Sequence, residues 1–177
     1  MKRVICLLEN GFEELEVIAP VDLLRRAEVE VVIAGVSGGE VTGRCGVRIL
    51  ADANFAEVSQ EDFDMLFLPG GPAVMELRKN TSVMDFISNF QGDAKLVAAI
   101  CAAPLLLKDA GILEGKRFTA HSTTREELPE STGESVEVDG EVITSRGAGT
   151  AVEFGLKLVE ILCGKVAADE VGRAVMV

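Results

Sequence analysis

The chain has 177 residues, which is the length of one domain, and 48% of them are hydrophobic while 26% are charged. These proportions are typical of a folded globular protein and exclude a disordered chain. With 29 acidic against 17 basic residues, the formal net charge is -12. Such a surface repels phosphate backbones and anionic lipids, so we expect neither nucleic acid nor a membrane as a partner.

Four cysteines stand at positions 6, 45, 101 and 163, and no two of them have CxxC spacing. This pattern disfavours a zinc ribbon or a thioredoxin-type site, and the single histidine excludes a multi-histidine metal centre. We therefore expect no metal and no cofactor. The first apolar run breaks at Glu9, too early for a secretory signal, and no run reaches the roughly twenty residues of a membrane span. The expectation is a cytoplasmic protein with reduced thiols.

The hydrophobic pattern alternates short strands with helices. Continuous apolar runs predict buried strands at residues 4–8, 29–34, 64–68 and 96–100, with a further short strand near Phe118. Helical spacing predicts helices at residues 13–27, 81–90, 102–110 and 150–162, with Thr81 as an N-cap and Gly164 as the last stop. A short hairpin or an excursion from the sheet is expected at residues 41–50, and a hairpin at residues 136–144.

This alternation predicts an α/β fold in which helices cover both faces of a mostly parallel sheet. The sequence contains no linker or repeat, so residues 1–177 are interpreted as a single domain. In such sheets ligands bind at the carboxyl ends of the strands, and candidate site residues are sought there.

Cys101 stands where a predicted buried strand runs directly into a predicted helix. Small neighbours such as Ala102 allow a sharp turn, and Pro104 suits a first helical turn, so the layout resembles a nucleophile elbow without its usual glycines. A helix N-terminus would lower the pKa of the thiol and hold an oxyanion. The alternative is a buried structural cysteine, which is the expectation for Cys6 and Cys163, whereas Cys45 is expected to be exposed.

Glu16 falls on the apolar face of the predicted helix at residues 13–27, between Leu23 and Ala27 on a helical wheel. A carboxyl group there is desolvated and should have a raised pKa, which would let it donate a hydrogen bond or exchange protons near neutral pH. The alternative is a carboxylate that merely favours the helix dipole, a role that Glu13 and Glu14 fill better.

Two glycine-containing turns and one histidine follow predicted strands. Gly70 and Gly71 would let backbone N–H groups approach a ligand, although a plain turn explains them equally well. Residues 145–150, with the sequence SRGAGT, could cradle an anion, but they lack the lysine and spacing of a nucleotide-binding loop. His121 is a candidate partner for the cysteine, since Cys–His pairing is a common route of thiol activation.

Taken together, the motifs resemble the ThiJ/PfpI superfamily, in the branch of the parkinsonism-associated deglycase (DJ-one) and bacterial YajL. The resemblance rests on GFEELE at 11–16, PVDLLRRA at 20–27, LPGG at 68–71, AAICAAP at 98–104 and TSRGAGT at 144–150. It implies one domain like the class I glutamine amidotransferases, a flavodoxin-like three-layer α/β/α sandwich and a homodimer. It implies Cys101 as nucleophile, Glu16 as a buried protonated acid, His121 as a third site residue, and Gly71 and Ala102 as backbone donors.

The chain departs from the family's pattern at three places. An arginine that relatives carry near position 45 is missing, or displaced to Arg44 or Arg48, and Ala148 replaces a more usual proline. The sequence ends at Val177, so we expect no equivalent of the extra C-terminal helix that covers part of the site in the human relative.

The resemblance implies several activities. One is glyoxalase III, which converts methylglyoxal to lactate without a cofactor, and another is deglycase action on glycated proteins; both would act on small dicarbonyls or their adducts. A different class is a thiol-based oxidative-stress sensor or redox-regulated chaperone. A third is a PfpI-type peptidase, which ranks last because that branch places a histidine after the cysteine, where this chain has Ala102.

Overall fold

The computed structural model describes residues 1–90 and 95–177, and within them a seven-stranded sheet runs in the order β5-β2-β1-β6-β7-β9-β8. Every neighbouring pair is parallel except β8 and β9, which form an antiparallel hairpin. The strands are β1 (Arg3–Leu8), β2 (Glu30–Gly35), β5 (Ala53–Asn54), β6 (Met65–Leu68), β7 (Leu96–Ile100), β8 (Val136–Asp139) and β9 (Val142–Ser145).

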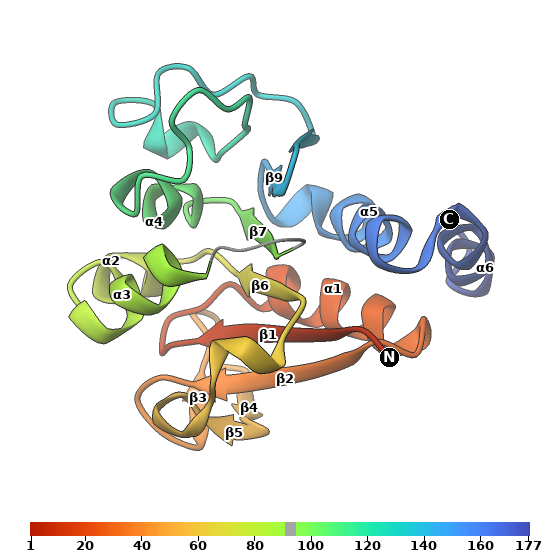
Figure 1. Cartoon of the computed structure of the whole chain (residues 1–177), viewed down its shortest axis with the longest axis horizontal. Coiled ribbons are helices and arrows are strands. Elements are labelled where there is room, and N and C mark those ends of the chain that lie inside the picture. The colour runs from red at the N-terminus through yellow and green to blue at the C-terminus, as the bar shows by residue number, and fades with distance from the viewer. Residues whose placement is uncertain (91–94) are drawn as a thin grey trace.

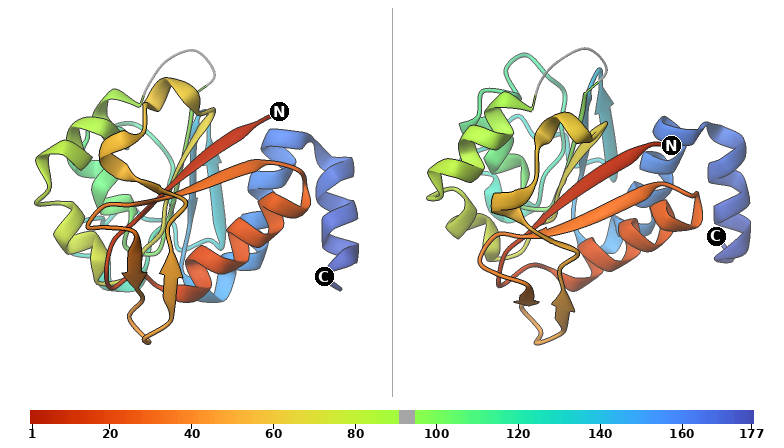
Figure 2. Two further views of the ribbon diagram at one scale, coloured as in Figure 1. Left: turned by 90° about the horizontal axis from the view of Figure 1, so that it is seen from below. Right: turned by 60° about the horizontal axis from the view of Figure 1, so that its bottom comes forward.

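Helices cover both faces of this sheet, which confirms the α/β sandwich expected from the sequence (Figure 1). One layer holds α1, α5 and α6, and the other holds α2, α3 and α4, as the edge-on views of Figure 2 show. The helices are α1 (Glu14–Arg26), α2 (Ala73–Leu77), α3 (Thr81–Asn89), α4 (Pro104–Asp109), α5 (Ala151–Cys163) and α6 (Lys165–Ala174).

The two cores follow from the alternation of side chains along each strand. In β1, Val4, Cys6 and Leu8 join the cluster under α1 and α5, whereas Ile5 and Leu7 join the cluster under α2–α4. A strand buried on both faces must be apolar at every position, which is why β1 reads as a continuous hydrophobic run.

The first helical layer depends on a close approach between α1 and α5. A Cβ atom added to Gly155 of α5 would stand 2.9 Å from the Cα atom of Pro20 in α1. The glycine therefore lets the two helices touch along their backbones. This contact holds α1, the helix that carries Glu16, in its place in the layer.

The predicted hairpin at residues 41–50 is confirmed as β3 (Glu40–Thr42) paired with β4 (Arg48–Leu50). It projects beyond the sheet at one end of the molecule (Figure 2). Glu14 of α1 ties its turn down, because Glu14 Oε1 accepts hydrogen bonds from the N–H groups of Cys45 at 2.7 Å and Val47 at 3.4 Å.

No strand forms near Phe118, so that prediction is wrong. Side-chain oxygens replace the partner strand: Thr119 N–H donates to Thr144 Oγ1, and Ala120 N–H donates to Ser131 Oγ, both at 2.9 Å. Residues 118–120 are buried, which is why their sequence looks like that of a strand.

The structure also corrects one helix cap and adds two helices that were not expected. Asn80, and not Thr81, caps α3, since its side chain accepts the Val83 N–H at 3.2 Å. Helix α2 was not expected because its five residues are too few to show helical spacing. Helix α6 was not expected because Gly164 ends α5, but the same glycine, at a φ of 89°, also begins the next helix.

Candidate active site

The candidate site lies at the carboxyl ends of β1, β6 and β7, where α/β sheets bind ligands. Glu16 lies on α1, which follows β1; Gly70 and Gly71 follow β6; Cys101 follows β7 directly. The sheet order changes direction at β1 and β6, so the loops that leave these strands diverge and open a space between them. The carboxyl edge expected from the pattern therefore gathers these residues in one place.

Cys101 has a φ of 67°, in the left-handed region that side chains rarely adopt. Its N–H donates to Ser145 O at 2.9 Å, so it continues the pairing of β7 with β9 by one residue. Pro104 then opens α4 in its first turn. The chain is forced to turn sharply at the sulfur-bearing residue, which is the strained geometry of a nucleophile elbow.

Glu16 is 1% exposed, and it lies between Gly70 and the cysteine. Its Oε2 accepts the Gly70 N–H at 3.0 Å, while Oε1 is buried without a conventional hydrogen-bond partner among the described residues. A Cβ atom on Gly70 would stand 2.5 Å from Glu16 Oε2 and 2.7 Å from Cys101 Cβ. Position 70 must therefore be glycine for the carboxyl group and the thiol to share this space.

Burial raises the pKa of the Glu16 carboxyl from 4.5 to about 7, although the Cys101 thiol and the Gly70 N–H partly offset it. The pKa of the Cys101 thiol rises to about 12, first through burial and then through the charge and hydrogen bond of Glu16. The N–H groups of Gly71 and Ala102 act in the opposite direction but do not outweigh these causes.

The expectation of a lowered thiol pKa is therefore wrong for the resting pair. The two groups are coupled, because a carboxylate beside the sulfur opposes a second negative charge. In the resting state Glu16 loses its proton first and Cys101 keeps its own. The pair can form a thiolate without a net change in charge if the thiol proton passes to the carboxylate.

Gly71 and Ala102 present their backbone N–H groups to the Cys101 sulfur. Gly71 has a φ of 94°, and a Cβ atom there would stand 2.5 Å from Gly11 O, so no other residue fits this turn. Two N–H groups aimed at one sulfur are also placed to receive an oxygen anion on an atom bonded to it.

His121 is held beside the cysteine by the backbone. Its N–H donates to Cys101 O at 2.8 Å, and its Nδ1 lies 2.9 Å from Thr123 Oγ1 and accepts the Thr123 N–H at 3.3 Å. An Nδ1 that accepts leaves the proton of the neutral ring on Nε2. The ring lines the same cavity as Cys101 and Glu16.

This cavity has a volume of about 480 Å³. The sequence left open whether the arginine that relatives carry near position 45 is missing or displaced to Arg44 or Arg48; Arg44 lines this cavity, and its Nη1 lies 3.1 Å from Glu13 Oε2. Arg48 pairs with Glu40 on the exposed hairpin instead, so Arg44 is the arginine that reaches the site. The position of Arg44 depends on the hairpin turn, which the spacing of residues 41–50 does not specify.

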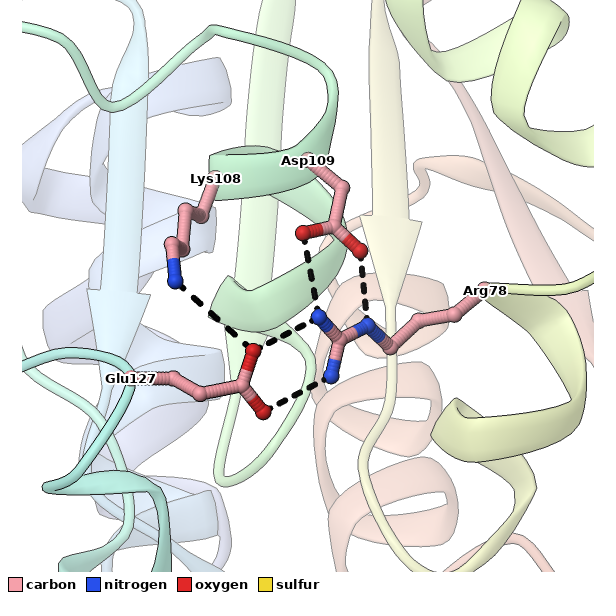
Figure 3. A network of polar contacts seen from close by, with 4 residues as sticks. All are labelled: Arg78, Lys108, Asp109 and Glu127. Atoms are coloured by element: carbon pink, nitrogen blue, oxygen red, sulfur yellow. Dashed lines mark hydrogen bonds and ion pairs between the residues drawn. The ribbon is translucent and has the colours of Figure 1, made fainter.

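A polar network joins three segments that border the cavity (Figure 3). Arg78, which follows α2, makes paired hydrogen bonds to Asp109 of α4 at 2.6 and 3.1 Å and to Glu127 at 2.7 and 2.9 Å. Lys108 Nζ lies 3.7 Å from Glu127 Oε2. The network links the segment after Gly71, the helix after Cys101 and the loop after His121. It therefore fixes the positions of these three cavity walls relative to one another.

The other cysteines lie away from this cavity. Cys6 is buried, and burial raises its thiol pKa, whereas Cys45 and Cys163 are exposed. The core position expected for Cys163 is therefore wrong, since its sulfur lies at the surface near Ala27 O. Across residues 1–90 and 95–177, no three His, Cys, Asp or Glu side chains gather as metal ligands would, and no helix there could cross a membrane.

Comparison with known proteins places the chain in one family. The model of the DJ-1/PfpI family matches residues 2–161. Protein dj-1beta of Drosophila melanogaster is 38% identical over 99% of this chain and 97% of its own length. The crystal structure of that DJ-1beta has a TM-score of 0.94 at 37% identity, and the match covers 99% of this chain and 98% of the other.

Two further relatives extend this comparison. A deglycase from Thermococcus kodakarensis is 33% identical over 90% of this chain and 99% of its own length. An oxidized DJ-1 from Toxoplasma gondii has a TM-score of 0.93 at 30% identity, covering 99% of this chain and 98% of the other. The chain belongs to the DJ-1/PfpI family.

Proposed function

We propose that the chain is a cofactor-free, cysteine-dependent enzyme that acts on reactive dicarbonyls, either free or as adducts on proteins. The observation that carries this proposal is the coupled pair of Cys101 and Glu16 at a strained turn that borders an open cavity. The relative named as a deglycase supports an enzymatic role. The reaction considered first is the conversion of methylglyoxal and water to lactate.

In the first step the Cys101 sulfur adds to the aldehyde carbon, and the thiol proton passes to the Glu16 carboxylate. This transfer removes the need for a free thiolate, which matters because the pKa of the thiol is about 12. The aldehyde oxygen takes the negative charge and receives hydrogen bonds from the N–H groups of Gly71 and Ala102 before it is protonated. The product of this step is a hemithioacetal.

In the second step a proton moves from the former aldehyde carbon to the neighbouring carbon, while the hydroxyl proton of the hemithioacetal passes to the oxygen of that neighbouring carbon. Glu16, with a pKa of about 7, can give and take this proton near neutral pH, and His121 is the second group placed to carry it. The shift converts the hemithioacetal to a thioester. Water then cleaves the thioester, releases the 2-hydroxy acid and returns the thiol, so no oxidant or reductant is consumed.

The test is lactate production from methylglyoxal by the wild-type chain, Cys101→Ser, Glu16→Gln and His121→Gln. We expect the first two variants to lose at least about a hundredfold in kcat/KM, the range of a lost nucleophile or general base. Cys163→Ser is the matched control, because it removes an exposed thiol outside the cavity. Such a thiol can trap an aldehyde but does not turn it over, so this variant should keep the wild-type rate. Equal rates in wild type, Cys101→Ser and Glu16→Gln would exclude the enzyme.

A second candidate is a thiol sensor in which Cys101 is oxidised to the sulfinic acid. It is favoured by Oε1 of Glu16, which has no conventional hydrogen-bond partner among the described residues and faces the Cys101 thiol, because a protonated carboxyl group can donate a hydrogen bond to a sulfinate. A relative solved in an oxidized form is consistent with this chemistry. Intact-mass spectrometry after mild peroxide should show a gain of two oxygens on Cys101 alone; equal oxidation of all four thiols would argue against it.

We also propose that the chain is a cytoplasmic homodimer that binds neither nucleic acid nor membranes. The net charge of -12 and four unpaired cysteines support the choice of compartment and partners. Exposed Leu15 and Ile18 on α1, with Val47 and Leu50 on the hairpin, offer an apolar surface for a second copy. Sedimentation at micromolar concentration tests this, and a monomer throughout would reject it.

A further inference from the structure

Beside the candidate active site lies a second cavity of about 460 Å³, the arginine cavity, whose wall includes His121, Arg125, Ser131, Gly133, Arg146 and Ala148. None of the described residues that line it is acidic. In a chain with a net charge of -12, a recess that contains two guanidinium groups and no carboxylate is a local reversal of the surface charge.

Arg125 and Arg146 also differ from most arginines of this chain in lacking an acidic partner within residues 1–90 and 95–177. Among the described residues, Arg125, Arg146 and Arg173 form no ion pair. The arginines that do form one are Arg3, Arg25, Arg26, Arg44, Arg48, Arg78 and Arg117. Two of the three unpaired arginines therefore line a single cavity, while Arg173 lies on α6.

Both guanidinium groups are nevertheless held in place. Arg125 Nη1 donates to Ser131 O at 2.8 Å, and Arg146 Nη1 donates to Gly133 O at 2.9 Å. Each uses one nitrogen for this anchor, and the other guanidinium nitrogens form no hydrogen bond among the described residues. Anchored donors with free N–H groups are suited to carboxylate or phosphate oxygens, because little side-chain entropy is lost on binding.

The arginine cavity adjoins the cavity of Cys101, since His121 and Ala148 line both. The two differ in charge: four glutamates and one arginine, Arg44, line the cavity of Cys101, whereas two arginines and no acidic residue line the described wall of the arginine cavity. An anionic group is repelled from the first and attracted to the second. A substrate with an aldehyde at one end and an anion at the other would thus be oriented across His121, with its aldehyde toward the sulfur.

We propose that the arginine cavity binds the anionic group, a carboxylate or a phosphate, of the dicarbonyl substrate. As a statement about substrate, this rests on the proposed function, whereas the binding of an anion does not depend on turnover. Residues 145–150 contribute to it through Arg146 and Ala148, whose segment leads into α5.

The first test measures binding without catalysis. Inorganic phosphate and glutarate are titrated by calorimetry into the wild-type chain and into Cys101→Ser, and we expect both proteins to bind at least one of them. Arg125→Gln and Arg146→Gln, which keep a donor for the loop carbonyl, should each weaken binding about tenfold or more, the range of a lost charge-assisted hydrogen bond. Arg125→Lys and Arg146→Lys should restore part of the affinity.

Arg173→Gln is the matched control, since it removes an unpaired arginine outside the arginine cavity and should leave the affinity unchanged. Phosphate binding without glutarate binding identifies a phosphate site, and the reverse identifies a carboxylate site; both results support the proposal. No binding of either probe by wild type, or equal binding by wild type and both glutamine variants, overturns it.

The second test links the cavity to turnover by comparing 4,5-dioxopentanoate with its methyl ester. With water, the acid is converted to 2-hydroxyglutarate by the same proton shift, and we expect its kcat/KM to exceed that of the ester about tenfold, with the preference lost in Arg125→Gln. Equal turnover of acid and ester leaves the enzyme proposal intact and overturns the arginine cavity as a substrate site. If Arg125→Gln weakens anion binding but neither compound is turned over, the result supports the arginine cavity as an anion site and rejects the proposed enzymatic function.

Discussion

The backbone N–H of His121 donates to the carbonyl oxygen of Cys101 at 2.8 Å, so the histidine is fixed to the very residue that bears the sulfur. The other face of the same residue is fixed as well, because Cys101 N–H donates to Ser145 O. Two loops distant in sequence are thereby joined through one strained position. Substitutions that act on this junction, on Glu16 or on the surrounding walls give distinct and measurable results.

Ionisation of Glu16 should govern the pH dependence of the rate. If its carboxylate takes the thiol proton, kcat/KM rises as the pH passes through about 7, the pKa of this group, and then reaches a plateau. Initial rates with methylglyoxal between pH 5 and 9 measure this. His121→Gln is the control. A rise in kcat/KM that persists in this variant belongs to the Glu16 carboxyl group, whereas a rise that vanishes would assign it to the imidazole.

Glu16→Gln should make the fold more stable above neutral pH. The native pKa of about 7 lies above the ordinary 4.5, so the folded state holds the proton more tightly than the unfolded state between these values. The free energy of unfolding therefore falls as pH rises from about 4.5 to 7, by up to about 3 kcal/mol. Urea unfolding should give Glu16→Gln a larger free energy of unfolding than wild type at pH 8, and a smaller difference between the two at pH 4.

Gly70→Ala should disrupt the site, because the new methyl group would meet the Glu16 carboxyl oxygen at 2.5 Å and Cys101 Cβ at 2.7 Å. We expect a loss of roughly 2 kcal/mol in stability, typical of overpacking, and loss of dicarbonyl turnover. Gly39→Ala is the matched control, since a methyl group there meets nothing within 4 Å. Equal unfolding curves for the two variants would contradict the packing described here.

Arg78→Lys keeps the positive charge but should lower the stability of the segments that form the cavity walls. Lysine cannot make the paired hydrogen bonds that Arg78 makes with Asp109 and Glu127, so we expect a loss of about 1–2 kcal/mol, reduced in high salt. The comparison is Lys79→Ala, which removes an exposed pair with Glu76 and should cost about 0.5 kcal/mol or less. Thermal unfolding at two salt concentrations distinguishes these outcomes.

The fold was largely predictable because buried parallel strands leave a strong signal in sequence. Runs such as that of β1 admit apolar residues at every position, and glycine or proline marks the ends of β6 and α5. The segment near Phe118 misled the same reasoning, since its backbone N–H groups pair with the side chains of Thr144 and Ser131, which lie 25 and 11 residues further along the chain. A hydrophobic pattern indicates that a segment is buried. It indicates only indirectly which groups pair with the backbone of that segment.

The candidate site was predictable in composition but not in electrostatics. Glu16 on an apolar helix face and Cys101 at a strand–helix junction are local features, and the structure brings both to one cavity. The thiol pKa depends on how deeply the sulfur is buried and on its contact with Glu16, which no local pattern specifies. For the same reason the sequence could not distinguish Arg44 from Arg48, since the place of each depends on how the hairpin turn folds over α1.

The pairing of Cys101 N–H with Ser145 O makes the sulfur-bearing residue the last rung of the β7–β9 ladder. A group attached to the end of a rigid ladder cannot travel toward its target, so small molecules must be delivered to it in the right orientation. Selectivity in this protein is then a property of the surrounding loops and their entrances, and reshaping those loops should alter which compounds react while leaving intrinsic reactivity constant.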